Sequence, residues 1–122
     1  NDIAAGNLDD KMMVTVAQLQ VPYIMMHMRG TPQTMQSQTQ YDDIVKEMLF
    51  YFSEKVAVAR NLGINDILID PGFGFSKTTR QNFEVLKKME LFQILELPLL
   101  VGLSRKSIVY KSHDISVNEA LN

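Results

Sequence analysis

The chain has 122 residues and a formal net charge of −2, which fits one small domain and argues against a nucleic-acid partner, because no excess of basic residues is available for phosphates. Hydrophobic residues make up 46% of the chain, which predicts a packed core, and no apolar run reaches the roughly 20 residues of a membrane helix. The absence of cysteine excludes disulfides and thiolate catalysis and suits a reducing compartment. We therefore expect a cytoplasmic domain with neither a nucleic-acid nor a membrane partner.

Short apolar stretches, taken in chain order, predict a series of buried strands. Residues 1–3 resemble the tail of a strand, and residues 21–28, 66–70 and 97–104 form three further apolar runs. Continuous runs of this length are typical of strands that are buried on both faces of a parallel sheet.

Helical periodicity fills the segments between these strands. Residues 8–20 begin with acidic residues and then repeat apolar side chains at Met12, Val16 and Leu19. Residues 116–122 resemble the beginning of another helix. The alternation of strands and helices predicts an α/β fold built from βα units around a parallel sheet.

The two longer helical patterns each predict one buried face. In residues 41–64, Gly63 is the expected helix stop. The predicted face of this helix consists of Ile44, Met48, Tyr51, Lys55, Val58 and Leu62. In residues 82–95 the predicted stripe consists of Phe83, Leu86, Met89, Leu91 and Phe92.

Both ends of the chain look incomplete for such a fold. A complete (β/α)8 barrel needs roughly 250 residues, about twice the length of this chain. We therefore expect residues 1–122 to form one barrel domain that is truncated at both ends. The polar, Gln-rich stretch at residues 29–40 is long enough to be a functional loop.

Polar residues follow each predicted strand, at residues 1–2, 26–29, 70–75 and 104–107. In parallel βα folds, ligands bind at this end of the strands. A buried carboxylate there is costly without a partner, and a ligand with N–H groups would supply one. A lysine in the last cluster adds a compact cation with three donors.

Each candidate residue also has a structural interpretation. Asp70 alone is compatible with a helix cap or a turn, and Lys106 with a solvated lysine at a helix start. His27 is expected to be a hydrogen-bonded structural residue, and composition favours inward packing for Phe73 and Phe75. Taken together, however, the strand ends favour a planar, nitrogen-rich heterocycle as ligand.

Four segments along the chain read "NDIAAG", "MHMRGTPQTMQ", "DPGFGFSKT" and "GLSRKS". These segments resemble the dihydropteroate synthase family, the sulfonamide target of the folate pathway. They occur in the family's order and at about its spacing, so that the resemblance spans the whole chain. Ser76 is a departure, because glycine is common at that position in the family.

The resemblance implies a pterin-binding (β/α)8 barrel, of which this chain would run from the end of strand four through strand seven. The implied reaction joins 7,8-dihydropterin pyrophosphate to p-aminobenzoate, giving 7,8-dihydropteroate and pyrophosphate. It also implies Mg²⁺ as cofactor, with ligands mostly outside this chain and no metal ligand assigned within it. Because a half-barrel leaves two sheet edges unpaired, we expect a homodimer that pairs through those edges, or else a poorly folded chain.

The resemblance also implies roles for individual residues. Asp70 and Lys106 are the expected catalytic residues. The expected substrate-binding residues are Asn1, Ile3 and Met26 in the pterin slot, Phe75 and Ser107 beside p-aminobenzoate, Gly74 where the backbone approaches the ligand, and Lys106 between the two substrates.

Two other functions remain open from the sequence. Corrinoid-dependent methyltransferases that use methyltetrahydrofolate have a similar pterin slot, although "GLSRKS" and "FGFSKT" favour the synthase. A non-catalytic paralogue or assembly subunit is the other alternative. Because much of the family's site would lie elsewhere, we expect the isolated chain to be inactive.

Overall fold

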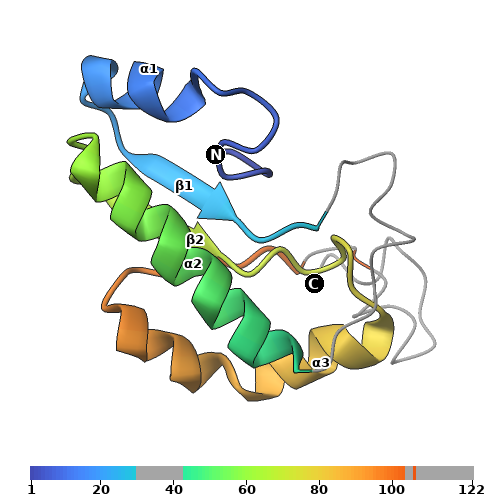
Figure 1. Cartoon of the computed structure of the whole chain (residues 1–122). Helices are drawn as coiled ribbons and strands as arrows, with labels where there is room; N and C mark the ends of the chain where they lie inside the picture. The colour runs from blue at the N-terminus through green and yellow to red at the C-terminus, as the bar shows by residue number, and fades with distance from the viewer. Residues whose placement is uncertain (30–42, 104–105, 107–122) are drawn as a thin grey trace.

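The computed structural model of the chain describes residues 1–29, 43–103 and 106, and strands and helices alternate along it as the sequence predicts (Figure 1). The elements are α1 (Met12–Leu19), β1 (Tyr23–Met26), α2 (Ile44–Asn61), β2 (Ile67–Asp70), α3 (Thr79–Lys87) and the 3₁₀ helix η2 (Met89–Leu95). The α/β class is therefore confirmed. The loop expected at residues 29–40 and the last predicted helix lie almost entirely outside the described residues.

The sheet is parallel, and its strands lie in the order in which they occur in the chain. β1 pairs with β2 from Tyr23 opposite Ile67 to Met26 opposite Asp70. A parallel bridge joins Asp2 to Met25 on the outer side of β1, which confirms the strand tail expected at the start of the chain.

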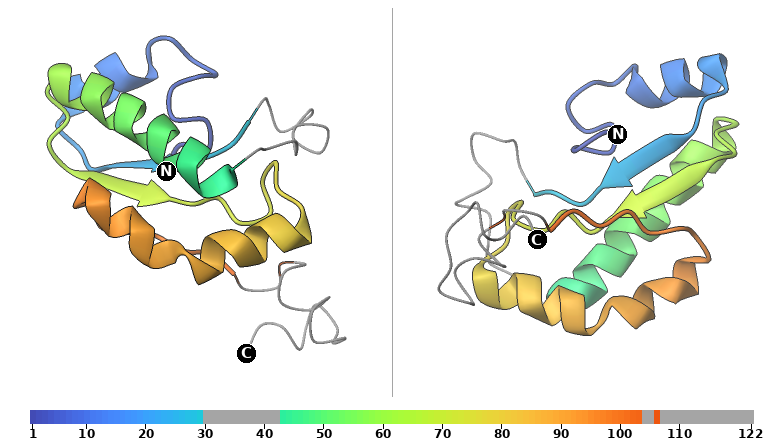
Figure 2. Two further views of the ribbon diagram at one scale, coloured as in Figure 1. Left: turned by 60° about the horizontal axis from the view of Figure 1, so that its bottom comes forward. Right: turned by 180° about the vertical axis from the view of Figure 1, so that it is seen from behind.

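The fourth predicted strand is present only as a parallel bridge between Leu99 and Ile69. The Ile69 N–H donates to the carbonyl of Pro98 at 3.0 Å, and the Leu100 N–H donates to the carbonyl of Ile69 at 2.9 Å. This segment therefore lies along the outer side of β2. Figure 2 shows it running beside β2 when the molecule is seen from behind.

The helices pack against the sheet through one contiguous core. α2 crosses the sheet and contacts both α3 and η2 (Figures 1 and 2). Met25 and Ile69 from the strands are fully buried with Phe52 from α2 and Phe92 from η2. Phe52 and Phe92 meet edge to face with ring centroids 6.3 Å apart, a favourable arrangement for aromatic pairs.

The predicted buried face of α2 is confirmed at Ile44 and Met48 and is wrong by about one residue further along the helix. The buried residues are Ile44, Val45, Met48, Phe52, Val56 and Ala59. Val58 is 50% exposed and Leu62 is 42% exposed, although both were expected inside. Lys55, which interrupted the predicted face, marks the edge of the buried row, and its ammonium donates to the amide oxygen of Asn7.

The stripes predicted for the other two helical regions are also wrong in part. Met13 is the buried residue of α1, whereas Leu19 is 65% exposed. Beyond α2, the α-helix stops at Lys87 and gives way to η2. A periodicity of 3.6 residues cannot be carried across that change of helix type. The buried side chains are accordingly Val85 and Phe92, while Phe83, Leu86 and Leu91 are exposed.

Two glycines fix the paths by which the chain leaves its elements. Gly63 follows α2 with φ +94° and, as expected, ends the helix, with the Ile64 N–H donating to the carbonyl of Ala59 at 3.0 Å. Gly72 follows β2 with φ +71°, and a Cβ atom there would lie 2.3 Å from the carbonyl oxygen of His27. Gly72 therefore has both a backbone and a spatial requirement for glycine.

We expect Gly72→Ala to lower the free energy of unfolding by about 2 kcal/mol or more, because it adds a backbone clash to the strain of a positive φ. Gly63→Ala is the matched control, since an added Cβ there meets nothing within 4 Å. The control should cost only about 1 kcal/mol. Urea denaturation of a protein that carries this chain measures both values, and equal losses for the two variants would contradict the assignment.

Candidate functional site

The carboxyl ends of the strands bring the candidate residues to one edge of the sheet. Met26 and Asp70 are paired at the ends of β1 and β2, and Asp2 bridges Met25 next to them. Residues from three separate segments thus meet where ligands bind in parallel βα folds.

Asp70 is the last residue of β2 and is only 8% exposed. Its Oδ1 atom accepts a hydrogen bond from the Gly72 N–H at 2.8 Å, so that the carboxylate does support a turn. Within the described part of the chain, this is the only hydrogen bond made to the carboxylate. The second oxygen therefore keeps its capacity to accept from a ligand.

Lys106 lies beside this carboxylate and under the same loop. Its Nζ atom donates to the carbonyl of Phe73 at 2.8 Å and sits 5.3 Å from the centre of the Phe75 ring. Burial lowers the pKa of Lys106, and the charge of Asp70 acts in the opposite direction. The structure thus brings together Asp70, Lys106 and Phe75, which the sequence placed in two separate motifs.

The loop between β2 and α3 is held by polar side chains at the start of α3. The Gly74 N–H donates to Asn82 Oδ1 at 2.9 Å, and Asn82 Nδ2 donates to the carbonyl of Thr78 at 2.9 Å. Thr78 begins α3 with a capping box that it shares with Gln81. Phe73 is fully buried, which confirms inward packing for this ring, while the Phe75 ring is half-buried beside Lys106.

Lys77 is a residue of this region to which sequence reasoning assigned no role. It is 6% exposed, and its Nζ atom donates to three carbonyls: His27 at 3.3 Å, Gly72 at 3.1 Å and Phe75 at 2.9 Å. Burial lowers the pKa of Lys77 to about 7; Asp70 raises it and Lys106 lowers it. Lys77 follows this glycine- and phenylalanine-rich turn with only Ser76 between them, but the sequence carries no signal for partners that are backbone carbonyls.

The residues expected to line a pterin slot differ in how deeply they are buried. Met26 is buried, Ile3 is half-buried, and Asn1 is exposed without a hydrogen bond to Asp70 or Lys106 in the described part of the chain. Ser107 lies outside the described residues.

Asp2 has a structural role at this edge. Its carboxylate accepts from the N–H groups of Ala4 at 3.0 Å and Gly6 at 2.7 Å, and from the Tyr23 hydroxyl at 2.6 Å. Burial and the neighbouring carboxylate raise the pKa of Tyr23, so the phenol keeps its proton and remains a donor.

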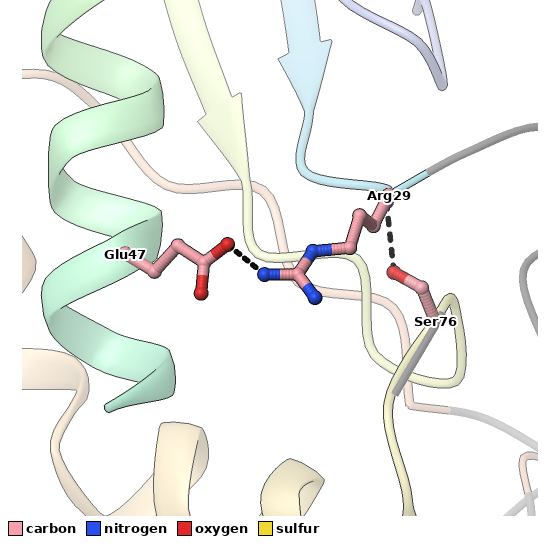
Figure 3. A network of polar contacts seen from close by, with 3 residues as sticks. All are labelled: Arg29, Glu47 and Ser76. Carbon is pink, nitrogen blue, oxygen red and sulfur yellow. Dashed lines mark hydrogen bonds and ion pairs between the residues drawn. The ribbon is translucent and has the colours of Figure 1, made fainter. Parts of the chain in front are cut away.

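A polar network ties the end of β1 to α2 and to the loop after β2 (Figure 3). The guanidinium of Arg29 forms an ion pair with Glu47, and the Arg29 N–H donates to Ser76 Oγ at 2.9 Å. Ser76 has φ +50°, a conformation that favours glycine, which is the residue expected there. The hydroxyl contact offsets part of that strain.

His27 is buried against α2, edge to face with Tyr51 at a centroid distance of 4.9 Å. Burial, together with the charges of Lys77 and Arg29, lowers the pKa of His27 well below its usual value. A neutral ring packed in this way supports the structural interpretation of His27.

Residues 1–29, 43–103 and 106 contain neither a cluster of metal-binding side chains nor a membrane-spanning helix. No group of three or more His, Cys, Asp or Glu side chains is placed to hold a metal ion among them. No metal ligand is therefore assigned among these residues. In the same residues, no helix combines the length and apolar character needed to span a bilayer.

Known proteins resemble the chain over nearly all of its length. The family model described as pterin binding enzyme matches residues 1–120. Dihydropteroate synthase of Synechocystis sp. is 43% identical over 116 residues, which are 93% of this chain and 40% of that protein. The enzyme of Escherichia coli K12 is 40% identical over 108 residues, 87% of this chain and 38% of that protein.

Solved structures agree with these matches. Yersinia pestis dihydropteroate synthase, in a sulfonamide drug complex, superposes with a TM-score of 0.91 at 34% identity, over 98% of this chain and 44% of that one. The Stenotrophomonas maltophilia enzyme, with imidazole bound in its active site, gives a TM-score of 0.92 at 35% identity, over 98% and 46%.

In each of these relatives the match covers only part of the protein's length. The chain spans about 40% of the length of the bacterial curated relatives and somewhat less than half of the solved chains. Motifs, fold and site geometry agree over this region. The chain belongs to the pterin-binding enzyme family and corresponds to a partial domain of dihydropteroate synthase.

Proposed function

We propose that this chain supplies the pterin- and p-aminobenzoate-binding part of a dihydropteroate synthase. The observation that carries the proposal is the position of the Lys106 ammonium, between the Phe73 carbonyl and the Phe75 ring and beside the buried Asp70 carboxylate. A cation, a carboxylate and an aromatic face at one strand edge suit a flat heterocycle joined to an aromatic amine.

The proposed architecture is one incomplete (β/α)8 barrel domain over residues 1–122, from the end of strand four through strand seven. Its support is the sheet order: the Asp2 segment, β1, β2 and the Leu99 segment are neighbours in chain order, and all are parallel. Consecutive parallel neighbours joined by helices are the repeating unit of such a barrel.

In the proposed reaction, Asp70 accepts hydrogen bonds from ring N–H groups of the pterin, and Lys106 donates to the ring. The C–O bond to pyrophosphate breaks, and the electron pair leaves with pyrophosphate. Positive charge then develops on the methylene group and the conjugated pterin. The fixed Asp70 carboxylate stabilises that charge.

The p-aminobenzoate amine then attacks the methylene carbon with its lone pair and loses a proton to solvent water, which gives 7,8-dihydropteroate. No nucleophile of the protein is required for this step. Phe75 would flank the p-aminobenzoate ring, and Ser107 would lie near its carboxylate. The Lys106 ammonium, placed 5.3 Å from the Phe75 ring centre, would border both substrates.

The remaining assignments are part of the same proposal. Asn1, Ile3 and Met26 would line the pterin, and Gly74 would let the backbone approach the ligand closely. Mg²⁺ would assist with ligands mostly outside this chain. The protein would act as a cytoplasmic homodimer.

We expect Asp70→Asn to lower p-aminobenzoate-dependent pyrophosphate release by at least about 100-fold, because a neutral amide cannot stabilise the developing positive charge. The assay follows pyrophosphate with and without p-aminobenzoate in a complete protein that carries this chain. Asp66→Asn is the matched control, since this exposed residue precedes β2 at the opposite end of the strand. It should keep wild-type activity.

The two outcomes of this assay separate the candidate functions. An undiminished rate in Asp70→Asn would remove Asp70 from the reaction. If the folded wild-type protein releases no pyrophosphate, methyl transfer to a corrinoid protein and pterin binding by calorimetry would distinguish a methyltransferase from a non-catalytic paralogue.

The isolated 122-residue chain is expected to show no turnover, because it spans about 40% of the length of its active bacterial relatives and supplies only some strand ends of the site. Product formation from the purified chain is measured by chromatography at high protein concentration. Detectable dihydropteroate that depends on p-aminobenzoate would contradict this expectation.

A further inference from the structure

Lys77 makes an unusual set of contacts for a lysine. Its side chain is 6% exposed, and all three N–H donors that an ammonium possesses have backbone carbonyl partners. No donor is left for a substrate. A direct catalytic contact by this residue is therefore excluded by its hydrogen bonding, and its effect must come through the groups that it holds.

The three carbonyls belong to two different strand ends. His27 follows β1, whereas Gly72 and Phe75 delimit a turn after β2 that is closed by the Phe75 N–H donating to the Gly72 carbonyl at 3.0 Å. The Lys77 side chain thus folds back onto the turn of residues 72–75 and connects that turn to the end of β1.

The same turn presents the groups that Lys106 contacts. Phe73 lies between Gly72 and Phe75, whose carbonyls accept from Lys77. Lys106 donates to the Phe73 carbonyl and lies near the Phe75 ring. We propose that Lys77 is a positioning residue of the site, whose buried ammonium fixes the turn of residues 72–75 against the end of β1 so that Lys106 and Phe75 meet the substrates. This inference rests on the function proposed above.

The charges around Lys77 make its hold on the turn dependent on pH. Asp70 attracts the ammonium and Lys106 repels it, while the neighbouring His27 is neutral because burial and the charges of Lys77 and Arg29 lower its pKa. Burial lowers the pKa of Lys77 to about 7. Above that pH the neutral amine has only two N–H groups for three carbonyls, so the turn loosens.

The effect on stability has the opposite sign to the effect on the site. Lys77 has a pKa of about 7 in the folded protein, against an ordinary value of 10.5. Across this window the unfolded chain binds more protons, so the contribution of Lys77 to the free energy of unfolding rises with pH. The slope of this rise corresponds to a difference of at most one bound proton between the unfolded and folded chains. Lys77→Met should remove the rise, and it also removes the hydrogen bonds that hold the turn.

The test compares wild type, Lys77→Met and Lys77→Arg in a complete protein that carries this chain. The control is Lys87→Met, which replaces an exposed lysine on α3. kcat and KM for p-aminobenzoate are measured from about pH 6 to pH 9. In wild type, kcat/KM should fall as pH rises through about 7, beyond any change due to the substrates.

In Lys77→Met we expect KM for p-aminobenzoate to rise about tenfold and the fall above pH 7 to disappear. Lys77→Arg keeps a permanent cation, so it should retain more activity at high pH than Lys77→Met and also lack the fall. The control should reproduce wild type. A wild-type KM and a wild-type pH profile in Lys77→Met would overturn the proposal, because a purely structural residue would lower only the amount of folded protein.

Hydrogen exchange gives a readout that does not depend on activity. In wild type, protection of the Phe75 amide, corrected for intrinsic rate, should fall as pH rises through about 7, and in Lys77→Met or Lys77→Arg it should not follow that titration. Unchanged protection in wild type would overturn the proposal even if neither variant folds. If wild type shows no synthase activity, the proposed function fails, and exchange still decides whether Lys77 holds the turn.

Discussion

The close approach of the turn after β2 to the end of β1 is the constraint on which the site depends. At Gly72 the backbone passes so near the His27 carbonyl that no side chain fits. This approach allows one turn to place a buried carboxylate at the end of β2 and to face the next strand end with backbone carbonyls. Because of this close approach, Asp70 and Lys77 both bond to the backbone of Gly72, and Lys77 also reaches the His27 carbonyl.

The polar groups buried at this edge are satisfied mainly by the backbone. Asp70 accepts from the Gly72 N–H, Asn82 accepts from the Gly74 N–H, and Ser76 accepts from the Arg29 N–H. Burying such groups is costly unless they are paired, and backbone partners are fixed by the fold itself. The edge is thereby held rigid while one carboxylate oxygen stays available.

The sequence predicted the parts of this arrangement that depend on apolar runs and glycines. The parallel strands and the stop of α2 at Gly63 follow from such signals, whereas the order of the strands was implied by the family resemblance. The predicted buried faces of the helices were displaced because a spacing of three and four residues fits two adjacent rows of side chains equally well. Packing on the sheet selects the row, so that Phe52 is buried and Val58 is exposed.

The candidate site was also only partly predictable from the sequence. Asp70, Phe75 and Lys106 could be selected because their side chains are chemically distinctive and follow apolar strands. Lys77 could not, because its partners are backbone carbonyls, which every residue carries. Asp2 was not recognised as a structural residue because two of its partners, Ala4 and Gly6, contribute only N–H groups, and the third, Tyr23, is distant in the sequence.

The order of the strands has a consequence for how the chain folds. Each strand pairs with the one that precedes it in the chain, and the helix between them packs on that pair. Contacts between successive units keep loop-closure entropy small compared with sheets whose neighbours are distant in sequence. The polypeptide can therefore organise in the direction of its synthesis, with β1 and α2 in place before the segment carrying Lys106 arrives to complete the edge.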